Sequence, residues 1–476
     1  ETRSLLMHVL HTSFECYPYA KVGGMADVIG ALPKYLQKLG VEASVVIPRY
    51  SRDWKLLELK PVFQGAFHLD WEYIPFTIEA STAEETPFPV YAVNIPGKFD
   101  RPDIYGYQDE ISRSISFQRA VLTWLRDGSM RPDIVHCHDH HTGLIPFMMG
   151  HCMEFGTLSN IPTVFTVHNG AYQGAFSWEL SRLLPAFPPA RGGLLEWGGV
   201  INALASGIKC CKKYTTVSEG YLYELMQDGH GLSSLYGAEW IKAVGILNGI
   251  DDDVWDPATD QMIEFNLKKK NIDAFKNKNK EAYCKAVGIN AEYPLYVFIG
   301  RFAYEKGADL LPSVAGEFLH KYRDVAFVFL GSGDPQTENH LRALEHYYGD
   351  RVRSHIMYSE KLAHQLYAAS DFLIMPSRVE PCGLNQMYTM RYGGIPIVHG
   401  IGGLRDTVTP LTEDAGNGYV FYELASHAVI PLLAVARNMY RHQDILTQIR
   451  KRNIALDFSW VKSGKRYIDA YNSVLA

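Results

Sequence analysis

The segment from residue 376 to residue 408 contains residue types that suit chemistry with an anionic leaving group. Glu380 lies in a turn pattern, Glu380-Pro381-Cys382-Gly383, between an apolar strand pattern at 371–376 and a helical pattern at Leu384–Tyr392. Backbone N–H groups at the start of a helix attract anions. The segment therefore predicts a carboxylate next to an anion site. An ordinary glycine-rich loop between a strand and a helix is the alternative that the glycines alone favour.

Two cations follow another apolar strand pattern, at Leu295–Gly300. Arg301 and Lys306 flank the turn after this strand, where two positive charges are well placed to neutralise a diphosphate leaving group. Two ordinary surface cations are the alternative interpretation.

Two glycine turns extend the phosphate hypothesis. Lys21-Val22-Gly23-Gly24 lies between a strand pattern at Leu5–His11 and a helical pattern at Asp27–Leu39, so the backbone can approach a phosphate while Lys21 supplies charge. This motif is neither a dinucleotide fingerprint nor a Walker loop. The second turn, Gly331-Ser332-Gly333-Asp334, lacks the third glycine of the fingerprint, and a plain turn explains it better.

The run His136-Cys137-His138-Asp139-His140-His141 raises the question of a metal. His136, His138 and His140 share one side at strand spacing, but zinc sites usually need three or four convergent ligands and no further ligand cluster is evident. We therefore expect no metal, and one histidine in contact with a substrate hydroxyl.

Asp109 and Glu110 follow the aromatic run Tyr105-Gly106-Tyr107. They could supply a catalytic or orienting carboxylate, and an acidic pair at the start of a helix is the equally good alternative.

Composition describes a globular protein without an obvious charged partner. The chain has 476 residues, 47% of them hydrophobic and 21% charged, with a net charge of -6. No global attraction to nucleic acid or to an anionic membrane follows from this charge. No apolar run approaches the ~18 residues of a membrane span, the first residues lack a signal-peptide pattern, and seven cysteines without a CxxC pair predict free thiols in a reducing compartment.

Strand patterns alternate with helical periodicity almost throughout, which predicts parallel, doubly wound α/β sheets. The alternation breaks near residue 250, so we expect a first Rossmann-like domain at 1–250, a second at 251–458, and a terminal helix at 459–476. Ligands of such sheets bind at the carboxyl ends of the strands. The lysine-rich stretch Lys268–Lys280 is interpreted as a solvated helix or loop.

Several established motif classes are missing from the sequence. It contains no G-x-S-x-G elbow, no HExxH motif and no protein-kinase signature set, which disfavours serine hydrolase, metalloprotease and kinase functions.

Taken together, the motifs resemble those of the ADP-glucose-dependent bacterial glycogen synthases and plant starch synthases, glycosyltransferase family 5. The resemblance covers nearly the whole chain and rests on many segments in one order: Glu15–Pro18, Lys21–Gly24, Pro132–Asp139, Thr166–Asn169, Tyr172–Gly174, Thr216–Ser218, Asn248–Asp251, Pro376–Arg378, Glu380–Leu384 and Gly402–Leu404.

This resemblance implies the GT-B fold, in which two Rossmann-like domains face an interdomain cleft and the last helix crosses back to the first domain. We expect the cleft to close on binding, because closure excludes water that would hydrolyse the donor. The resemblance implies retaining transfer of glucose from ADP-glucose to the non-reducing 4-OH of an α-1,4-glucan, without a metal or other cofactor. The implied partners are ADP-glucose and glycogen, starch or malto-oligosaccharides. The implied location is the cytoplasm for a bacterial protein and the plastid for a plant or algal one.

The resemblance also implies donor-site roles. Lys21 would bind donor phosphate with the Gly23-Gly24 backbone, and Arg301 with Lys306 would hold the diphosphate. Tyr358 would pack on the base. The backbone of Cys382, Gly383 and Leu384 would complete the phosphate site.

Sugar-site roles follow in the same way. Glu380, Asn248 and His141 would contact the transferred glucose, and Asp109 would lie near the acceptor. Retention suggests a nucleophile, for which Glu380 is the obvious candidate. We instead expect Glu380 to orient the sugar, in a same-face substitution in which the leaving phosphate helps to deprotonate the acceptor.

The chain departs from the family pattern at five positions, which concern the acceptor more than the donor: His140 for Trp, Glu110 for Asn, Met25 for Leu, Ala205 for Lys and Gly394 for Thr. Alternatives are a UDP-glucose-dependent enzyme of the same fold and a non-catalytic glucan-binding protein built on it. A phosphorylase or a dinucleotide oxidoreductase fits the motifs less well.

Overall fold

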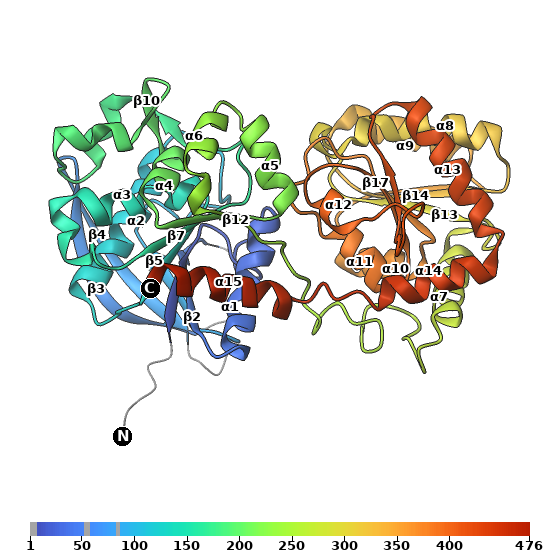
Figure 1. The fold of residues 1–476 in the computed structure, drawn as a ribbon, viewed down its shortest axis with the longest axis horizontal. Helices are drawn as coiled ribbons and strands as arrows, with labels where there is room; N and C mark the ends of the chain where they lie inside the picture. The colour runs from blue at the N-terminus through green and yellow to red at the C-terminus, as the bar shows by residue number, and fades with distance from the viewer. Residues whose placement is uncertain (1–6, 52–57, 82–85) are drawn as a thin grey trace. The chain divides into compact units, whose positions relative to one another are not determined.

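The computed structural model describes residues 7–51, 58–81 and 86–476. The chain divides into two compact units: unit 1 is Glu1–Gly249 with Trp460–Ala476, and unit 2 is Ile250–Ser459 (Figure 1). The last helix therefore belongs to the same unit as the first strands. No helix among the described residues is both long and apolar enough to cross a bilayer.

Unit 1 is built on one large mixed sheet. Its strand order is β12 (Ala243–Gly245), β11 (Lys213–Thr216), β7 (Thr163–Val167), β6 (Ile134–His138), β1 (His8–Thr12), β2 (Glu42–Pro48), β5 (Val90–Asn94), β4 (Glu72–Ser81) and β3 (Leu59–Leu69). The strands from β12 to β5 pair in parallel, as expected for a doubly wound sheet.

The edge of this sheet corrects the expectation of a purely parallel arrangement. β4 pairs antiparallel with both β3 and β5. Only two residues connect β3 to β4, and the first, Asp70, has a positive φ of 58°. So short a connection permits only an antiparallel hairpin, because parallel neighbours need a long crossover.

The helices of unit 1 lie between these strands in the sequence, except α15 (Trp460–Leu475), which follows unit 2. They are α1 (Gly24–Lys38), α2 (Glu110–Asp127), α3 (Ile145–His151), α4 (Ala203–Cys210), α5 (Glu219–Gln227), α6 (Ser233–Ala238) and α15, and a small sheet orders β8 (Ala175–Phe176), β10 (Val200–Asn202) and β9 (Glu196–Trp197). α15 lies beside α1 (Figure 1) and buries Trp460, Tyr467 and Tyr471 against the core that contains Leu32 and Leu36 of α1. This aromatic face anchors the end of the chain to unit 1.

Four buried histidines lie together where β1, β6 and β7 end. Nδ1 of His11 lies 3.0 Å from Nε2 of His138, and Nδ1 of His138 lies 3.0 Å from Nε2 of His168. His136 contacts the Tyr471 hydroxyl of α15 at 2.8 Å and the Thr166 hydroxyl at 2.6 Å. Burial lowers the pKa of His11 and of His168 to about 3, so the folded protein keeps these rings neutral.

Unit 2 contains a parallel sheet of the doubly wound type. Its strand order is β15 (Val352–Ile356), β14 (Ala326–Gly331), β13 (Leu295–Ile299), β16 (Phe372–Met375), β17 (Ile395–His399) and β18 (Tyr419–Phe421). Alternate residues of β13 face two different cores, Tyr296 and Phe298 on one side and Leu295 and Val297 on the other. Burial on both faces explains why these strands are apolar throughout.

Helices cover both faces of this sheet. They are α7 (Ile272–Val287), α8 (Leu311–Lys321), α9 (Pro335–Tyr347), α10 (Glu360–Ala369), α11 (Asn385–Arg391), α12 (Gly402–Thr407), α13 (Ser426–Tyr440) and α14 (Gln443–Ile454). α8 begins only at Leu311, because Gly307 is left-handed with a φ of 67° and separates two short 3-10 turns, Tyr304–Lys306 and Ala308–Leu310.

The lysine-rich stretch is not wholly solvated, which corrects its interpretation from sequence. Lys276 and Lys280 of α7 are only 1% and 3% exposed. Lys280 Nζ lies 2.7 Å from Asp371 Oδ2, and Arg450 donates to Asp371 Oδ1 at 2.9 Å. Asp371 also accepts a hydrogen bond from the Leu295 backbone N–H. One buried carboxylate thus ties α7 and α14 to the first residue of β13.

We predict that Lys280→Met destabilises the protein by about 3 kcal/mol, because removal of one partner leaves a buried charge partly uncompensated. Chemical denaturation measures this loss. Lys278→Met is the matched control, since this lysine lies on the exposed face of the same helix, and it should change the free energy of unfolding by under about 0.5 kcal/mol. Equal effects of the two changes would refute the structural role of Lys280.

We also predict that acid destabilises unit 1 through the histidine cluster. Above about pH 7.5 the histidines are largely neutral in both states, so their full contribution to stability is present. As the pH falls towards 3, the unfolded chain takes up protons that the folded rings refuse, and the free energy of unfolding drops by about 1.4 kcal/mol per pH unit for each histidine. Asp139 partly offsets this loss, since burial raises its pKa to about 7.

Denaturation series at pH 7.5, 6.5 and 5.5 measure the slope. His11→Gln should reduce this slope by the contribution of about one proton. His427→Gln, at an exposed position, should leave the slope unchanged. A slope that His11→Gln does not alter would contradict this account.

Candidate functional site

Glu380 is held by a cation and a hydroxyl. Both carboxylate oxygens lie 2.8 Å from Nζ of Lys306, and Ser377 donates its hydroxyl hydrogen to Oε2 at 2.9 Å. Glu380 is only 7% exposed. The structure therefore brings two residues singled out in the sequence, Glu380 and Lys306, into direct contact. A carboxylate with both oxygens engaged in this way is suited to orienting a ligand more than to attacking one.

Backbone contacts join the loop of residues 300–307 to the segment that contains Glu380. The Glu305 carbonyl accepts hydrogen bonds from the N–H groups of Arg378 and Val379, at 2.8 and 3.2 Å. A Cβ on Gly307 would lie 1.8 Å from the Pro376 carbonyl oxygen, so only glycine permits this approach. The sequence alone does not single out Gly307, because its partner lies 69 positions later and gives no local signal.

Arg301 extends from the same loop. Its side chain is 66% exposed and its Nη2 lies 2.5 Å from Oε1 of Glu305. An exposed pair of this kind contributes little to stability and can be exchanged for another anion at low cost. The cation is therefore accessible to a diphosphate, although it is not one of the groups that contact Glu380 in this structure.

A side-chain amide holds the turn at Cys382, Gly383 and Leu384 in place. Gln386 donates to the carbonyl oxygens of Cys382 and Gly383, at 3.1 and 2.8 Å, and Gly383 has a left-handed φ of 72°. Asn385 donates to the Ile299 carbonyl at 2.7 Å, which ties the start of α11 to the end of β13. The sequence does not reveal these two amide side chains, which look there like ordinary helix residues.

Tyr358 and Asn248 differ in their exposure to solvent. Tyr358 follows β15 in unit 2 and is 79% exposed, so its ring is accessible to a ligand. Asn248 lies in unit 1 and is buried, yet its Oδ1 has no hydrogen-bond partner among the residues that the structure describes. A buried acceptor without a partner is costly unless a ligand supplies a donor.

The loop at residues 21–23, here called the Lys21 loop, leads directly into α1. Lys21 Nζ lies 2.6 Å from Asp27 Oδ1. A Cβ on Gly23 or Gly24 would meet no atom within 4 Å, so packing does not require glycine at either position. Open space beside a helix start fits the approach of a ligand to the backbone.

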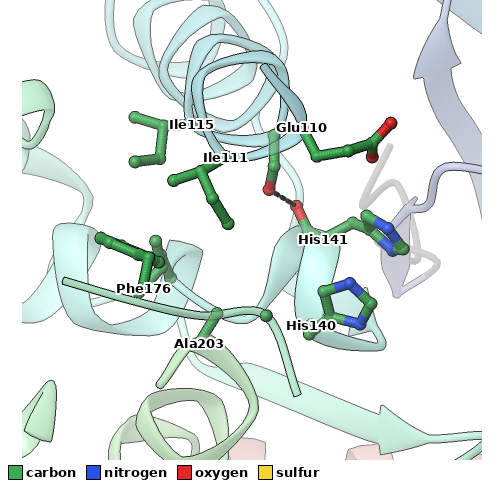
Figure 2. Close-up of a pocket in the computed structure, with 10 residues that line it drawn as sticks. Glu110, Ile111, Ile115, His140, His141, Phe176 and Ala203 are labelled. Atoms are coloured by element: carbon green, nitrogen blue, oxygen red, sulfur yellow. Dashed lines mark hydrogen bonds between the residues drawn. The ribbon is translucent and has the colours of Figure 1, made fainter. Parts of the chain in front are cut away.

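His141 lines a small cavity in unit 1. The cavity has a volume of about 30 Å³ and is lined by residues that include Glu110, Ser114, His140 and His141 (Figure 2). Ser114 donates to the His141 carbonyl at 3.1 Å, which fixes the turn after β6. Glu110 and His140, two of the departures from the family pattern, therefore line the same cavity as His141, a predicted sugar contact.

Asp109 precedes α2 and is held by Arg101, which donates to its two oxygens at 2.6 and 2.8 Å. These hydrogen bonds lower the pKa of Asp109, so the carboxylate is charged at neutral pH. Glu110, the second acid of the pair, has a different partner: its Oε1 accepts a hydrogen bond from Arg113 at 2.8 Å.

The histidine run does not form the arrangement that strand spacing suggested. His140 lies in a 3-10 turn beyond β6, and the third ring beside His136 and His138 belongs to His11. The ligand atoms of these three lie within 4.8 Å of one another, but both ring nitrogens of His136 already contact hydroxyls. The geometry is that of a hydrogen-bonded cluster, and the absence of a metal stays a prediction.

Comparison with known proteins identifies the family of the chain. Residues 8–237 match the family model described as the starch synthase catalytic domain, and residues 279–432 match that of glycosyl transferases group 1. A glycogen synthase of Flavobacterium johnsoniae is 42% identical over 98% of this chain and 99% of its own, and one of Desulforamulus reducens is 36% identical over 98% and 99%.

Two solved structures have the same fold. The catalytic domain of starch synthase IV from Arabidopsis thaliana, bound to ADP and acarbose, is 31% identical with a TM-score of 0.89 over 99% of both chains. A sucrose-phosphate synthase from Thermosynechococcus elongatus, 14% identical, has a TM-score of 0.63 over 98% of both chains and supports the fold alone. The full-length similarity to glycogen synthases and the two-domain GT-B fold show that the chain belongs to the glycogen and starch synthase family.

Proposed function

We propose that the protein is a retaining α-1,4-glucosyltransferase that transfers glucose from ADP-glucose to the non-reducing 4-OH of an α-1,4-glucan. The observation that supports this most is the contact between Lys306 and Glu380 beside Arg301. These residues follow β13 and β16, which are parallel neighbours in the sheet of unit 2. Ligands of such sheets bind beyond the carboxyl ends of the strands.

The proposed mechanism places the donor diphosphate against Arg301 and Lys306. The bond between C1 of glucose and the phosphate oxygen breaks, and ADP leaves with the electron pair. Its developing charge is stabilised by cations that are already in place. The acceptor 4-OH attacks C1 on the face that ADP leaves, and its proton passes to the departing phosphate. Both charges come from side chains, so the proposal requires no metal and no further cofactor.

Glu380 has an orienting role in this proposal. Lys306 and Ser377 engage both of its oxygens, which disfavours a covalent intermediate on Glu380. From unit 1, Asn248 and His141 would contact the sugar, and Asp109 would lie near the acceptor. Lys21 and the Gly24 backbone would bind donor phosphate, because the Gly23 N–H already donates to Glu15 at 2.9 Å. Asn248 Oδ1 has no hydrogen-bond partner among the described residues, which supports its part, since a sugar hydroxyl would supply the donor.

A donor with an adenine base is favoured by the comparison, and one residue offers a surface on which a base can pack. The starch synthase IV structure was solved with ADP, and the exposed Tyr358 ring is available to pack on a base. The curated relatives are bacterial glycogen synthases, so we place the reaction in a bacterial cytoplasm and the acceptor as a glycogen-like glucan. A UDP-glucose enzyme and a non-catalytic glucan-binding protein are the competing proposals.

We predict that radiolabelled glucose enters glycogen from ADP-glucose at a rate at least about tenfold above that from UDP-glucose. β-Amylase should then release the label as maltose, because this enzyme cleaves α-1,4 linkages from non-reducing ends. Faster incorporation from UDP-glucose would overturn the donor assignment. Glycogen binding without incorporation from either donor would overturn the enzymatic function.

We predict that Arg301→Ala lowers kcat by about 100-fold or more, because one preorganised charge contact in a transition state contributes about 3 kcal/mol. Arg342→Ala is the matched control. Arg342 is 54% exposed and pairs with Glu338 four residues away, as Arg301 pairs with Glu305, but it lies on α9 outside the proposed site. Near-normal turnover of Arg301→Ala on ADP-glucose would refute the mechanism.

A further inference from the structure

Glu15 is a buried carboxylate for which the proposed reaction has no role. It is 4% exposed and precedes the Lys21 loop. Its Oε2 accepts hydrogen bonds from the backbone N–H groups of Val22 and Gly23, at 2.6 and 2.9 Å. Its Oε1 accepts the hydroxyl hydrogen of Tyr105 at 2.7 Å. One side chain therefore fixes the middle of the loop from within unit 1.

Tyr105 connects this carboxylate to the predicted sugar contact. Its ring lies 5.0 Å from the ring of His141 at an interplanar angle of 25°, and Phe14 lies 4.4 Å from the same imidazole at 16°. The hydroxyl end of Tyr105 thus holds Glu15 while its face packs on His141. A continuous series of contacts runs from the Lys21 loop through Glu15 and Tyr105 to His141.

We propose that Glu15 and Tyr105 are positioning residues that fix the Lys21 loop and His141 relative to each other. This inference rests on the proposed function. Glu15 accepts hydrogen bonds from the N–H groups of Val22 and Gly23 and so holds the loop in one conformation. Lys21 and the Gly24 N–H at the start of α1 are then the groups that would bind donor phosphate. Hydrogen bonds to a charged acceptor are among the stronger ones in proteins, so they suit this task.

The opposite role is also testable. A carboxylate on two backbone N–H groups could be an internal competitor that donor phosphate must displace. Removal of a competitor tightens donor binding, whereas removal of a positioning group weakens it. The sign of the change in affinity for ADP therefore decides between the two roles.

The experiment compares purified full-length Glu15→Ala, Glu15→Asp and Glu15→Gln. Glu15→Ala and Glu15→Asp should raise the KM for ADP-glucose and the Kd for ADP about tenfold or more, since a charged hydrogen bond is lost or cannot span the same distance. The KM for glycogen should stay within about twofold. Glu15→Gln should recover most of the affinity, because its amide oxygen can still accept from both N–H groups.

Tyr105 variants separate the two contacts of that residue. Tyr105→Phe removes the hydroxyl and keeps the ring, so it should raise the KM for ADP-glucose severalfold with kcat nearly unchanged. Tyr105→Leu also removes the ring from His141 and should lower kcat as well. The matched control is Glu79→Gln, a partly buried glutamate that accepts from Arg49 and Asn94 outside the proposed site.

Tighter ADP binding by Glu15→Ala, or donor and glycogen KM values that rise together without rescue by Glu15→Gln, would overturn the proposal. If Glu15→Ala does not fold, Tyr105→Phe decides the matter, since an unchanged Kd for ADP would equally overturn it. Failure of the proposed function looks different: the unmodified protein would incorporate no glucose.

Discussion

The candidate donor site depends on the close approach of two loops at the carboxyl ends of β13 and β16. Gly307 permits it, because any side chain there would strike the Pro376 carbonyl. The approach lets the Glu305 carbonyl bind the N–H groups of Arg378 and Val379, and it puts Lys306 against Glu380. The ion pair is thus a consequence of backbone geometry, which makes its position precise.

The architecture and the location of several candidate-site residues at strand ends can be predicted from the sequence, because their signals are local. Apolar runs that end in glycine and charged residues indicate parallel strands with ligands at their ends, and this pattern alone places Arg301, Lys306 and Glu380 at strand ends. The antiparallel β3–β4 hairpin escapes such a prediction, since its strands carry much exposed surface and lack the buried pattern of the others.

Other features could not be predicted, because they depend on residues far apart in the chain. Lys280 looks like part of a solvated lysine run until Asp371, 91 positions away, is found beside it. His11 joins His138 across 127 positions, and Tyr105 reaches Glu15 across 90. Burial of a polar group is decided by such partners, and a single sequence does not reveal which strands bring them together.

The two units use the same arrangement of charges. Each has a buried carboxylate held by fixed donors, Glu380 by Lys306 and Glu15 by backbone N–H groups, and a proposed phosphate cation paired with a nearby acid, Arg301 in unit 2 and Lys21 in unit 1. The buried carboxylates cannot move without leaving charge unpaired, whereas the cations lie in solvent-accessible pairs of small net energy. In each unit a rigid acid can therefore set the local backbone shape, while an exchangeable cation stays accessible to an anion.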